Sequence, residues 1–141
     1  MCDNMSAKRE IIRGFKSKSE LTDTDARQLA RLIEQRGHFC ADPQYYKNEK
    51  HFHPLIVVGM PTDEDAYEIA EKFGHTTQVQ GYCWTVSRNL EVIALLNRII
   101  PYLEIKRKKA EKALEMANTV KNKAKRWKER TIELAEEMNE F

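Results

Sequence analysis

The stretch Leu29-Ala30-Arg31-Leu32-Ile33-Glu34-Gln35-Arg36-Gly37-His38-Phe39 marks a change from helix to strand. Apolar residues recur at spacings of three and four over residues 26–33, which predicts a helix with one buried face. Gly37 is a typical helix end, and Thr22, three residues before an acid, is a typical start. Apolar residues then alternate, which predicts a strand over residues 38–46.

Further helices and strands can be placed outward from this stretch. The pattern predicts a turn at 47–50, strands at 52–59, 76–80 and 82–87, and helices at 61–73 and 90–100. The order α-β-β-α-β-β-α predicts an α+β fold, with a four-stranded antiparallel sheet that carries helices on one face. Residues 1–20 form a basic arm, residues 21–103 form this module, and residues 104–141 are expected to form one long basic helix, because they contain no Gly or Pro.

Apolar residues in the last segment repeat at an average spacing of 3.5, which is the period of a coiled-coil seam. The seam consists of Ala113, Ala117, Val120, Ala124, Trp127, Thr131, Leu134 and Met138. A helix of this length either pairs with a second copy or folds back across the body. We expect a homodimer, in which Val120, Trp127 and Leu134 contribute to the contact.

Composition and charge limit the classes of function that the chain can have. The net charge of +2 is unevenly distributed along the sequence, because residues 1–18 and 104–141 each carry a net charge of +3. Basic flanks suit a polyanion such as nucleic acid, although they also suit a solvated helix surface. No apolar run is long enough to cross a membrane, and the three cysteines are sparse. We therefore expect an intracellular protein with reduced thiols and no membrane partner.

Over residues 22–117 the sequence resembles the LAGLIDADG homing endonucleases. The resemblance is carried by the order and spacing of several short signals. They are the Leu29-to-Gly37 helix end with Phe39, the apolar strand after Pro54, Phe73-Gly74, the strand Tyr82-Cys83-Trp84-Thr85-Val86, Leu95-Leu96, and Ile100-Pro101-Tyr102-Leu103 running into Lys106-Arg107-Lys108. The resemblance implies two paired modules whose first helices pack side by side and whose sheets form a saddle over the major groove of DNA.

The sequence departs from that family where cleavage would occur. The resemblance implies small residues at Arg31 and Gln35 and a metal-binding acid at Arg36. Arg36 cannot bind Mg²⁺, which takes carboxylate and water oxygens. Glu34 matches the other acid of the motif, where a structural role is expected, and Asp42 is a candidate contributor to an altered metal site. We predict no metal and no cofactor, with Mg²⁺ needed only if cleavage is retained.

The predicted contacts with double-stranded DNA fall into two groups. Short polar side chains on the outward sheet face suit the reading of base edges, and basic side chains suit contact with phosphates. The first group is His38, Cys40, Gln78, Gln80, Thr85 and Ser87, and the second is Lys47, Lys50, Arg88, Lys106, Arg107 and Lys108.

Several alternatives remain open at this point. The pairs His38/Cys40 and His51/His53, with Cys83 nearby, contain residue types that bind Zn²⁺, although their spacing matches no common zinc motif. The function most consistent with the sequence is that of a catalytically inactive, nucleic-acid-binding relative of the endonucleases. Two other functions remain open. The chain could be an active endonuclease with an altered metal site, or a protein-binding module that uses the fold as a scaffold.

Overall fold

The computed structural model describes residues 14–15, 21–75 and 82–141. Its helices are α2 (Asp23–Arg36), α3 (Asp63–Phe73), α4 (Asn89–Ile99), the 3₁₀ turn η1 (Ile100–Tyr102), α5 (Arg107–Asn122) and α6 (Trp127–Met138). Its strands are β1 (Gly14–Phe15), β2 (Gly37–Tyr46), β3 (Glu49–Gly59), β4 (Gly74–His75) and β5 (Cys83–Val86). No helix in these ranges is both long and apolar enough to cross a lipid bilayer. The α+β class predicted from the sequence is confirmed.

An antiparallel sheet in the order β2-β3-β5 forms the centre of the molecule. The register aligns Phe39 with Ile56 and Ile56 with Val86, and it aligns Val58 with Trp84. All five side chains are buried. Since aligned partners point to the same side of a sheet, these residues form the face that packs on the core.

Four strands were predicted, and the described residues show three in this sheet. The fourth predicted strand, residues 76–80, lies outside the described residues and is not confirmed. The residues before it form β4, which pairs with β1 in a separate two-stranded sheet. Gly14 and Phe15 of the predicted N-terminal arm therefore take part in a strand pair, in the register Gly14 with His75 and Phe15 with Gly74.

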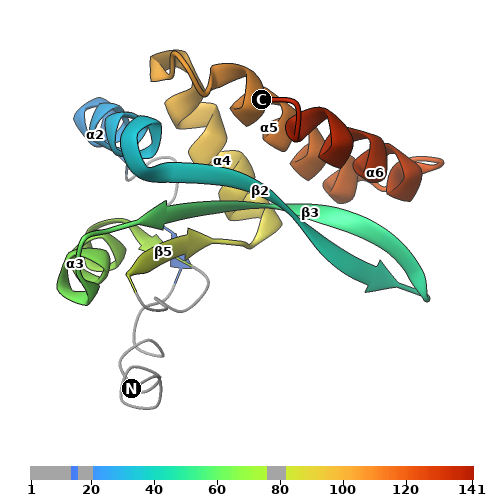
Figure 1. Ribbon diagram of the computed structural model, residues 1–141, viewed down its shortest axis with the longest axis horizontal. Helices are drawn as coiled ribbons and strands as arrows, with labels where there is room; N and C mark the ends of the chain where they lie inside the picture. The colour runs from blue at the N-terminus through green and yellow to red at the C-terminus, as the bar shows by residue number, and fades with distance from the viewer. Residues whose placement is uncertain (1–13, 16–20, 76–81) are drawn as a thin grey trace.

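The β2–β3 hairpin twists strongly along its length. In Figure 1 the two strands cross between α2 and the hairpin turn. The buried side of β3 changes along the same length: Pro54, Ile56 and Val58 are buried near α2, whereas His51, on the other face, is buried near the turn. The turn residues Lys47 and Asn48 have φ values of 53° and 65°, as in the two-residue turns that match this twist.

Helix α2 follows the sequence pattern closely. The Thr22 hydroxyl accepts a hydrogen bond from the Asp25 amide, and the Asp25 carboxylate accepts one from the Thr22 amide, so the predicted capping box is present. At the other end, a Cβ on Gly37 would lie 2.7 Å from Cγ2 of Ile33 and 2.8 Å from its backbone oxygen. Only glycine lets β2 leave the helix at this point without displacing α2.

The prediction of one long C-terminal helix is wrong. The chain turns between α5 and α6, with Lys123 at φ 48° and Arg126 at φ 63°, and the two helices lie side by side over the sheet (Figure 1). The predicted seam is largely buried inside this helical hairpin: Ala113, Ala117, Val120, Thr131, Leu134 and Met138. These residues cannot form the predicted contact with a second copy, because the chain's own helices cover them.

Candidate nucleic-acid interface

The outward face of the sheet near α2 carries a row of side chains across all three strands. The register aligns His38 with Val57 and Val57 with Thr85, on the face opposite the buried core. His38 is exposed, and Thr85 is half-buried. Cys40 lies on the same face, opposite Leu55. The structure therefore brings together three of the residues predicted to read bases.

The other predicted base-reading positions divide between two regions. Ser87 follows β5 and continues the alternation of Cys83 and Thr85, so it belongs to the outward face. Arg88 lies one residue further on, just before α4, and is exposed. Gln78 and Gln80 lie outside the described residues.

The C-terminal end of α2 is closed by contacts within the chain. Glu34 accepts hydrogen bonds from the backbone amides of Glu104, at 2.7 Å, and Lys106, at 3.2 Å. The ammonium of Lys106 donates to the backbone oxygens of Ile33, at 2.9 Å, and Gly37, at 2.6 Å. A cation there is favourable, because the carbonyl end of a helix carries partial negative charge. Burial lowers the pKa of Lys106, and the nearby Glu34 opposes this shift.

Two further predicted phosphate contacts lie beside this junction. The guanidinium of Arg107 donates to the backbone oxygens of Leu103 and Pro101, both at 2.9 Å, and so fastens η1 to the start of α5. Lys108, one residue further along α5, is exposed. Of the predicted basic group at residues 106–108, two members therefore hold the chain together and one points to solvent.

The residues at the end of α2 do not fit a divalent metal. Arg36 is exposed and presents a guanidinium, and Glu34 already accepts two backbone hydrogen bonds through one oxygen. Asp42 lies six residues from Arg36 along β2, which corresponds to about 20 Å of strand. In the described ranges, no three His, Cys, Asp or Glu residues are arranged to hold a metal ion.

The predicted zinc ligands are also kept apart. Cys83 lies opposite Gly59, whereas His51 and His53 lie toward the hairpin turn, opposite Gln44 and Asp42. His53 and Cys83 are thus separated by about 20 Å of β3. The arrangement does not support a shared zinc site.

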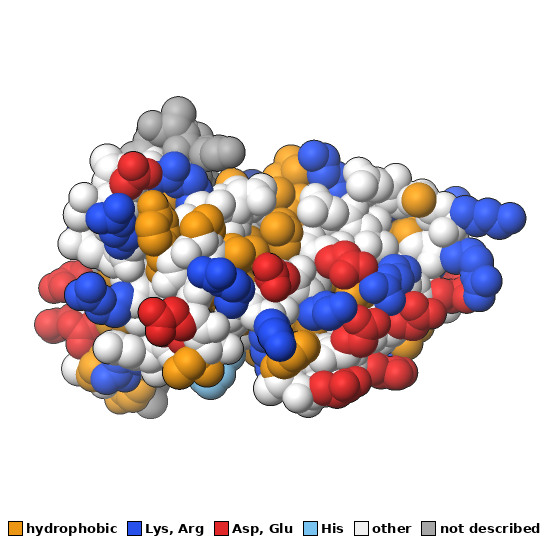
Figure 2. Space-filling model, turned by 90° about the horizontal axis from the view of Figure 1, so that it is seen from above, with side chains coloured by type: hydrophobic (Ala, Val, Ile, Leu, Met, Phe, Trp, Pro, Cys, Tyr) orange, Lys and Arg blue, Asp and Glu red, His pale blue; other side chains and the backbone are white. Residues whose placement is uncertain are grey.

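A basic cluster lies at the far end of the molecule, where two turns meet. The α5–α6 turn approaches the β2–β3 turn, and the ammonium groups of Lys123 and Lys47 lie 5.9 Å and 5.4 Å from the centre of the same Tyr46 ring. We define the distal basic cluster as Lys47, Lys50, Lys121, Lys123, Lys125 and Arg126, all of them exposed. Basic side chains project from this end of the helical hairpin in Figure 2.

Most of the positive charge in the distal basic cluster is not neutralised by the described part of the chain. Arg126 pairs with Glu129. Among the described residues, no carboxylate forms an ion pair with Lys121, Lys123 or Lys125. The cluster is therefore available to a polyanion.

Two histidines lie under the α5–α6 turn. Nε2 of His51 lies 3.0 Å from Nε2 of His53, and the His51 ring packs edge-on against Trp127 with 4.8 Å between ring centres. Burial lowers the pKa of both histidines, and the positive charge of Lys123 lowers it further. The pair therefore favours neutral imidazoles, which hold the turn against the sheet.

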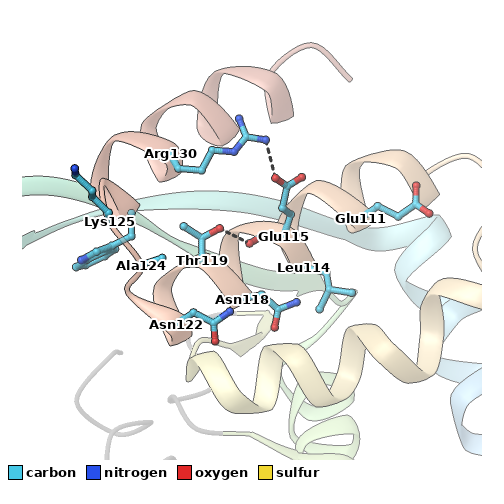
Figure 3. Close-up of a pocket in the computed structure, with 10 residues that line it drawn as sticks. Glu111, Leu114, Glu115, Asn118, Thr119, Asn122, Ala124, Lys125 and Arg130 are labelled. Carbon is cyan, nitrogen blue, oxygen red and sulfur yellow. Dashed lines mark hydrogen bonds and ion pairs between the residues drawn. The ribbon is translucent and has the colours of Figure 1, made fainter.

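The outer surface of the helical hairpin carries a hollow of about 500 Å³, between α5 and the start of α6 (Figure 3). One of the charged residues that line it, Arg130, is already paired: it contacts Glu115 at 2.6 Å and Glu137 at 3.0 Å. Hydrogen bonds, first with Glu115 and then with Glu133, raise the pKa of Arg130. This network joins the two helices.

Sequence reasoning missed the lysines of the α5–α6 turn as candidate contacts. The signal was present, because residues 121–126 contain four basic side chains and no acid. Their role was hidden by the expectation of a continuous helix, which would distribute them around its axis. Tyr45, which is 71% exposed next to the β2–β3 turn, was also missed. The alternation of apolar and polar residues along β2 does not reveal that the buried side of the hairpin changes along its length.

No protein-family model matches the sequence, and a search of curated proteins finds no significant relative. Among solved structures, the archaeal intron-encoded homing endonuclease I-Vdi141I complexed with DNA is 18% identical, with a TM-score of 0.67 over 84% of each chain. The homing endonuclease I-CvuI in complex with its target is 16% identical, with a TM-score of 0.67 over 83% of this chain and 81% of that one.

A third match is the LAGLIDADG homing endonuclease I-GzeII in complex with its DNA target, which is 11% identical, with a TM-score of 0.59. It aligns with 80% of this chain, which spans only 43% of the longer protein. These identities establish a shared fold and nothing further. The chain has the fold of the LAGLIDADG homing endonucleases, as the resemblance in its sequence predicted.

Proposed function

We propose that this chain binds double-stranded DNA without cleaving it. The observation that carries the proposal is the distal basic cluster, whose lysines are exposed and form no ion pair among the described residues, at one end of a sheet that carries His38, Cys40 and Thr85 on its outward face. A polyanion that lies along the sheet meets both features. The solved structures of the same fold include DNA complexes, which supports DNA as the polyanion.

The distal basic cluster and the outward face of the sheet would make different kinds of contact with DNA. Lysines of the distal basic cluster contact phosphates, which contributes affinity and orientation but no sequence information. His38, Cys40 and Thr85 present short polar side chains to base edges in the major groove. Because the hairpin twists, Tyr45 and Lys50 continue the solvent-facing surface toward the turn.

The absence of cleavage rests on the end of α2. A metal-dependent nuclease needs carboxylate oxygens near the scissile phosphate. Here Arg36 stands at the last position of the helix, Glu34 accepts two backbone hydrogen bonds, and Asp42 lies far along the strand. Arg36 instead offers a fixed positive charge that attracts a phosphate and holds it without reaction.

We also propose that two copies bind one DNA site. A single module presents one sheet, and a second copy would extend the contacted surface across both halves of a target. The buried seam of α5 and α6 is excluded as the contact, so the pair must form through another surface.

The experiment is a selection from a pool of random DNA duplexes, carried out with Mg²⁺ and scored for both capture and strand breaks. We expect capture of a subset of sequences and intact DNA. The pool should be offered in parallel to the Arg36→Glu variant, in which repulsion from phosphate should weaken binding. Breaks that disappear on chelation would overturn the absence of cleavage. Failure to retain duplex DNA at low salt would overturn DNA binding and favour the protein-binding alternative.

A further inference from the structure

Two histidines on β3 point the same ring nitrogen toward each other. His51 and His53 are two residues apart, so both side chains leave the same side of the strand. Their Nε2 atoms lie 3.0 Å apart, and their ring centres lie 4.9 Å apart. Between neutral rings, one Nε2 donates its proton to the other. A cation that replaces this proton therefore meets two nitrogen lone pairs.

The surroundings hold these two rings in place. The His51 ring, which is only 4% exposed, packs edge-on against Trp127. Between the two histidines, the backbone amide of Phe52 donates a hydrogen bond to the Thr131 hydroxyl at 3.0 Å, which fixes this part of β3 to α6 (Figure 1). Two ligands that are held in position before an ion arrives lose little entropy when it binds.

The distance between the two nitrogens indicates the kind of cation. Imidazole nitrogens lie about 2.0–2.1 Å from a bound transition metal, so two of them 3.0 Å apart subtend an angle of about 90–97° at the ion. The tetrahedral angle of a zinc site would require about 3.3–3.4 Å. A right angle between neighbouring ligands is typical of square-planar Cu²⁺, which is also the divalent ion that nitrogen ligands bind most tightly.

The remaining coordination positions fall to water and to one carboxylate. Both histidines line a hollow of about 230 Å³, which has room for water molecules on the ion. In the described ranges, no third His, Cys, Asp or Glu is already placed to complete the site. Asp42 is aligned with His53 across the β2–β3 pair, and directly opposed residues have Cβ atoms about 4.5–5.5 Å apart. Rotation of the Asp42 side chain brings a carboxylate oxygen toward the ion.

The charges around the pair both oppose and allow a cation. Lys128 forms an ion pair with Glu49 at 2.8 Å, so its charge is offset. Lys123 is exposed at the α5–α6 turn, and its ammonium is free to move into solvent when an ion binds. Burial lowers the pKa of both histidines, and Lys123 lowers it further, so the rings are neutral near pH 7. The neutral ring is the form that binds a metal.

We propose that His51 and His53 bind a Cu²⁺ ion through their Nε2 atoms, with water and Asp42 as the further ligands. The site lies at the turn end of the β2–β3 hairpin, whereas Arg36, at the position of the family's metal-binding acid, lies at the end of α2. Only two of the five residues considered as zinc ligands take part. The bound ion joins β2 to β3 near the turn and places positive charge beside the distal basic cluster.

The test is a titration of the full chain with Cu²⁺, without DNA and with glycine as a competing chelator. Cu²⁺ quenches the fluorescence of a tryptophan close to it, and of the two tryptophans Trp127 packs on His51. Trp84 is aligned with Val58, about 17 Å along β3 from His53. We expect quenching of Trp127. The Trp127→Phe variant should bind the same copper, measured by calorimetry, and lose this quenching.

The ligands are tested by single replacements. His53→Gln should raise the dissociation constant for Cu²⁺ by at least about a hundredfold, because even the loss of a partner outside the ligand shell costs about 10–100-fold. His51→Gln should have the same effect. His38→Gln is the matched control, since His38 is an exposed histidine of β2 near α2, and it should leave the dissociation constant unchanged. Circular dichroism checks that each variant is folded.

Two charge variants separate a metal site from a histidine pair that only supports the fold. Asp42→Asn should weaken copper binding by about tenfold. Lys123→Gln should strengthen it several-fold, because a like charge is removed. Copper held by cysteine thiols is common to all these variants and cancels in the comparison. Absence of quenching in the wild-type chain, or histidine variants at 51 and 53 that bind copper as tightly as His38→Gln, would overturn the proposal. Zinc that binds the pair more tightly than copper would also overturn it.

Discussion

The two ends of the β2–β3 hairpin use positive charge in opposite ways. At the α2 end, Lys106 is turned inward, and its ammonium bonds to backbone oxygens of Ile33 and Gly37. At the turn end, Lys121 and Lys125 reach solvent without a carboxylate partner among the described residues. The first end is a structural junction, and the second is a surface available to a ligand. A lysine's place in a basic run therefore does not reveal its role; the backbone groups around it do.

The comparison predicts that the junction end is intolerant of added volume. Gly37→Ala should lower the free energy of unfolding by about 2–3 kcal/mol, because the new methyl group meets the backbone of Ile33. Gly59→Ala is the matched control, since no atom lies within 4 Å of its Cβ position. Urea unfolding of both variants measures the difference. Equal stabilities of the two variants would show that α2 and β2 are not closely packed at Gly37.

A smaller loss of stability is expected when the inward lysine is removed. Lys106→Met should lower the free energy of unfolding by about 1–2 kcal/mol, because two carbonyl groups lose a charged donor. Lys108→Met, two residues further along α5, removes an exposed ammonium and should change stability by less than about 0.5 kcal/mol. A variant at Lys108 that is as unstable as the one at Lys106 would remove the distinction between the two lysines.

The histidines at the turn end should make the stability of the protein depend on pH. The pKa values of His51 and His53 are lowered below 6.5 in the folded chain, mainly by burial and, for His53, by the neighbouring His51. The unfolded chain therefore binds more protons as the pH falls through 6.5, and stability that is fully present above this pH is lost below it.

Urea unfolding at about pH 7.5 and about pH 5.5 measures this loss. Replacing both histidines by glutamine should flatten the dependence, whereas His38→Gln, on the exposed row near α2, should leave it in place. A dependence that survives the double replacement would place the responsible group elsewhere.

The sequence predicted most of the fold because its local signals agree with the packing. The Thr22 cap, the glycine at 37 and the alternation of Phe39, Ile56 and Trp84 each specify an element and its buried side. The turn between α5 and α6 carried no such signal, because its two left-handed residues are Lys123 and Arg126 and not glycine. The apolar repeat correctly indicated a helix pair, but the partner is the same chain.

The candidate site was harder to predict for a physical reason. His38, Cys40 and Thr85 follow from strand alternation, which fixes the side that a residue faces. The availability of a basic residue depends on tertiary contacts: Lys106 and Arg107 bond to carbonyl oxygens that the sequence does not place near them. The lysines of the distal basic cluster lie together only because the α5–α6 turn approaches the β2–β3 turn.

The salt dependence of DNA binding tests the difference between the two ends most directly. Each phosphate neutralised contributes about −0.9 to the slope of log affinity against log salt concentration. Changing Lys121, Lys123 and Lys125 together to Gln should make the slope shallower by about 2–3. Lys106→Met should leave the slope of the folded protein unchanged. The reverse result, a slope altered by Lys106→Met and not by the triple change, would contradict the assignment of phosphate contact to the distal basic cluster.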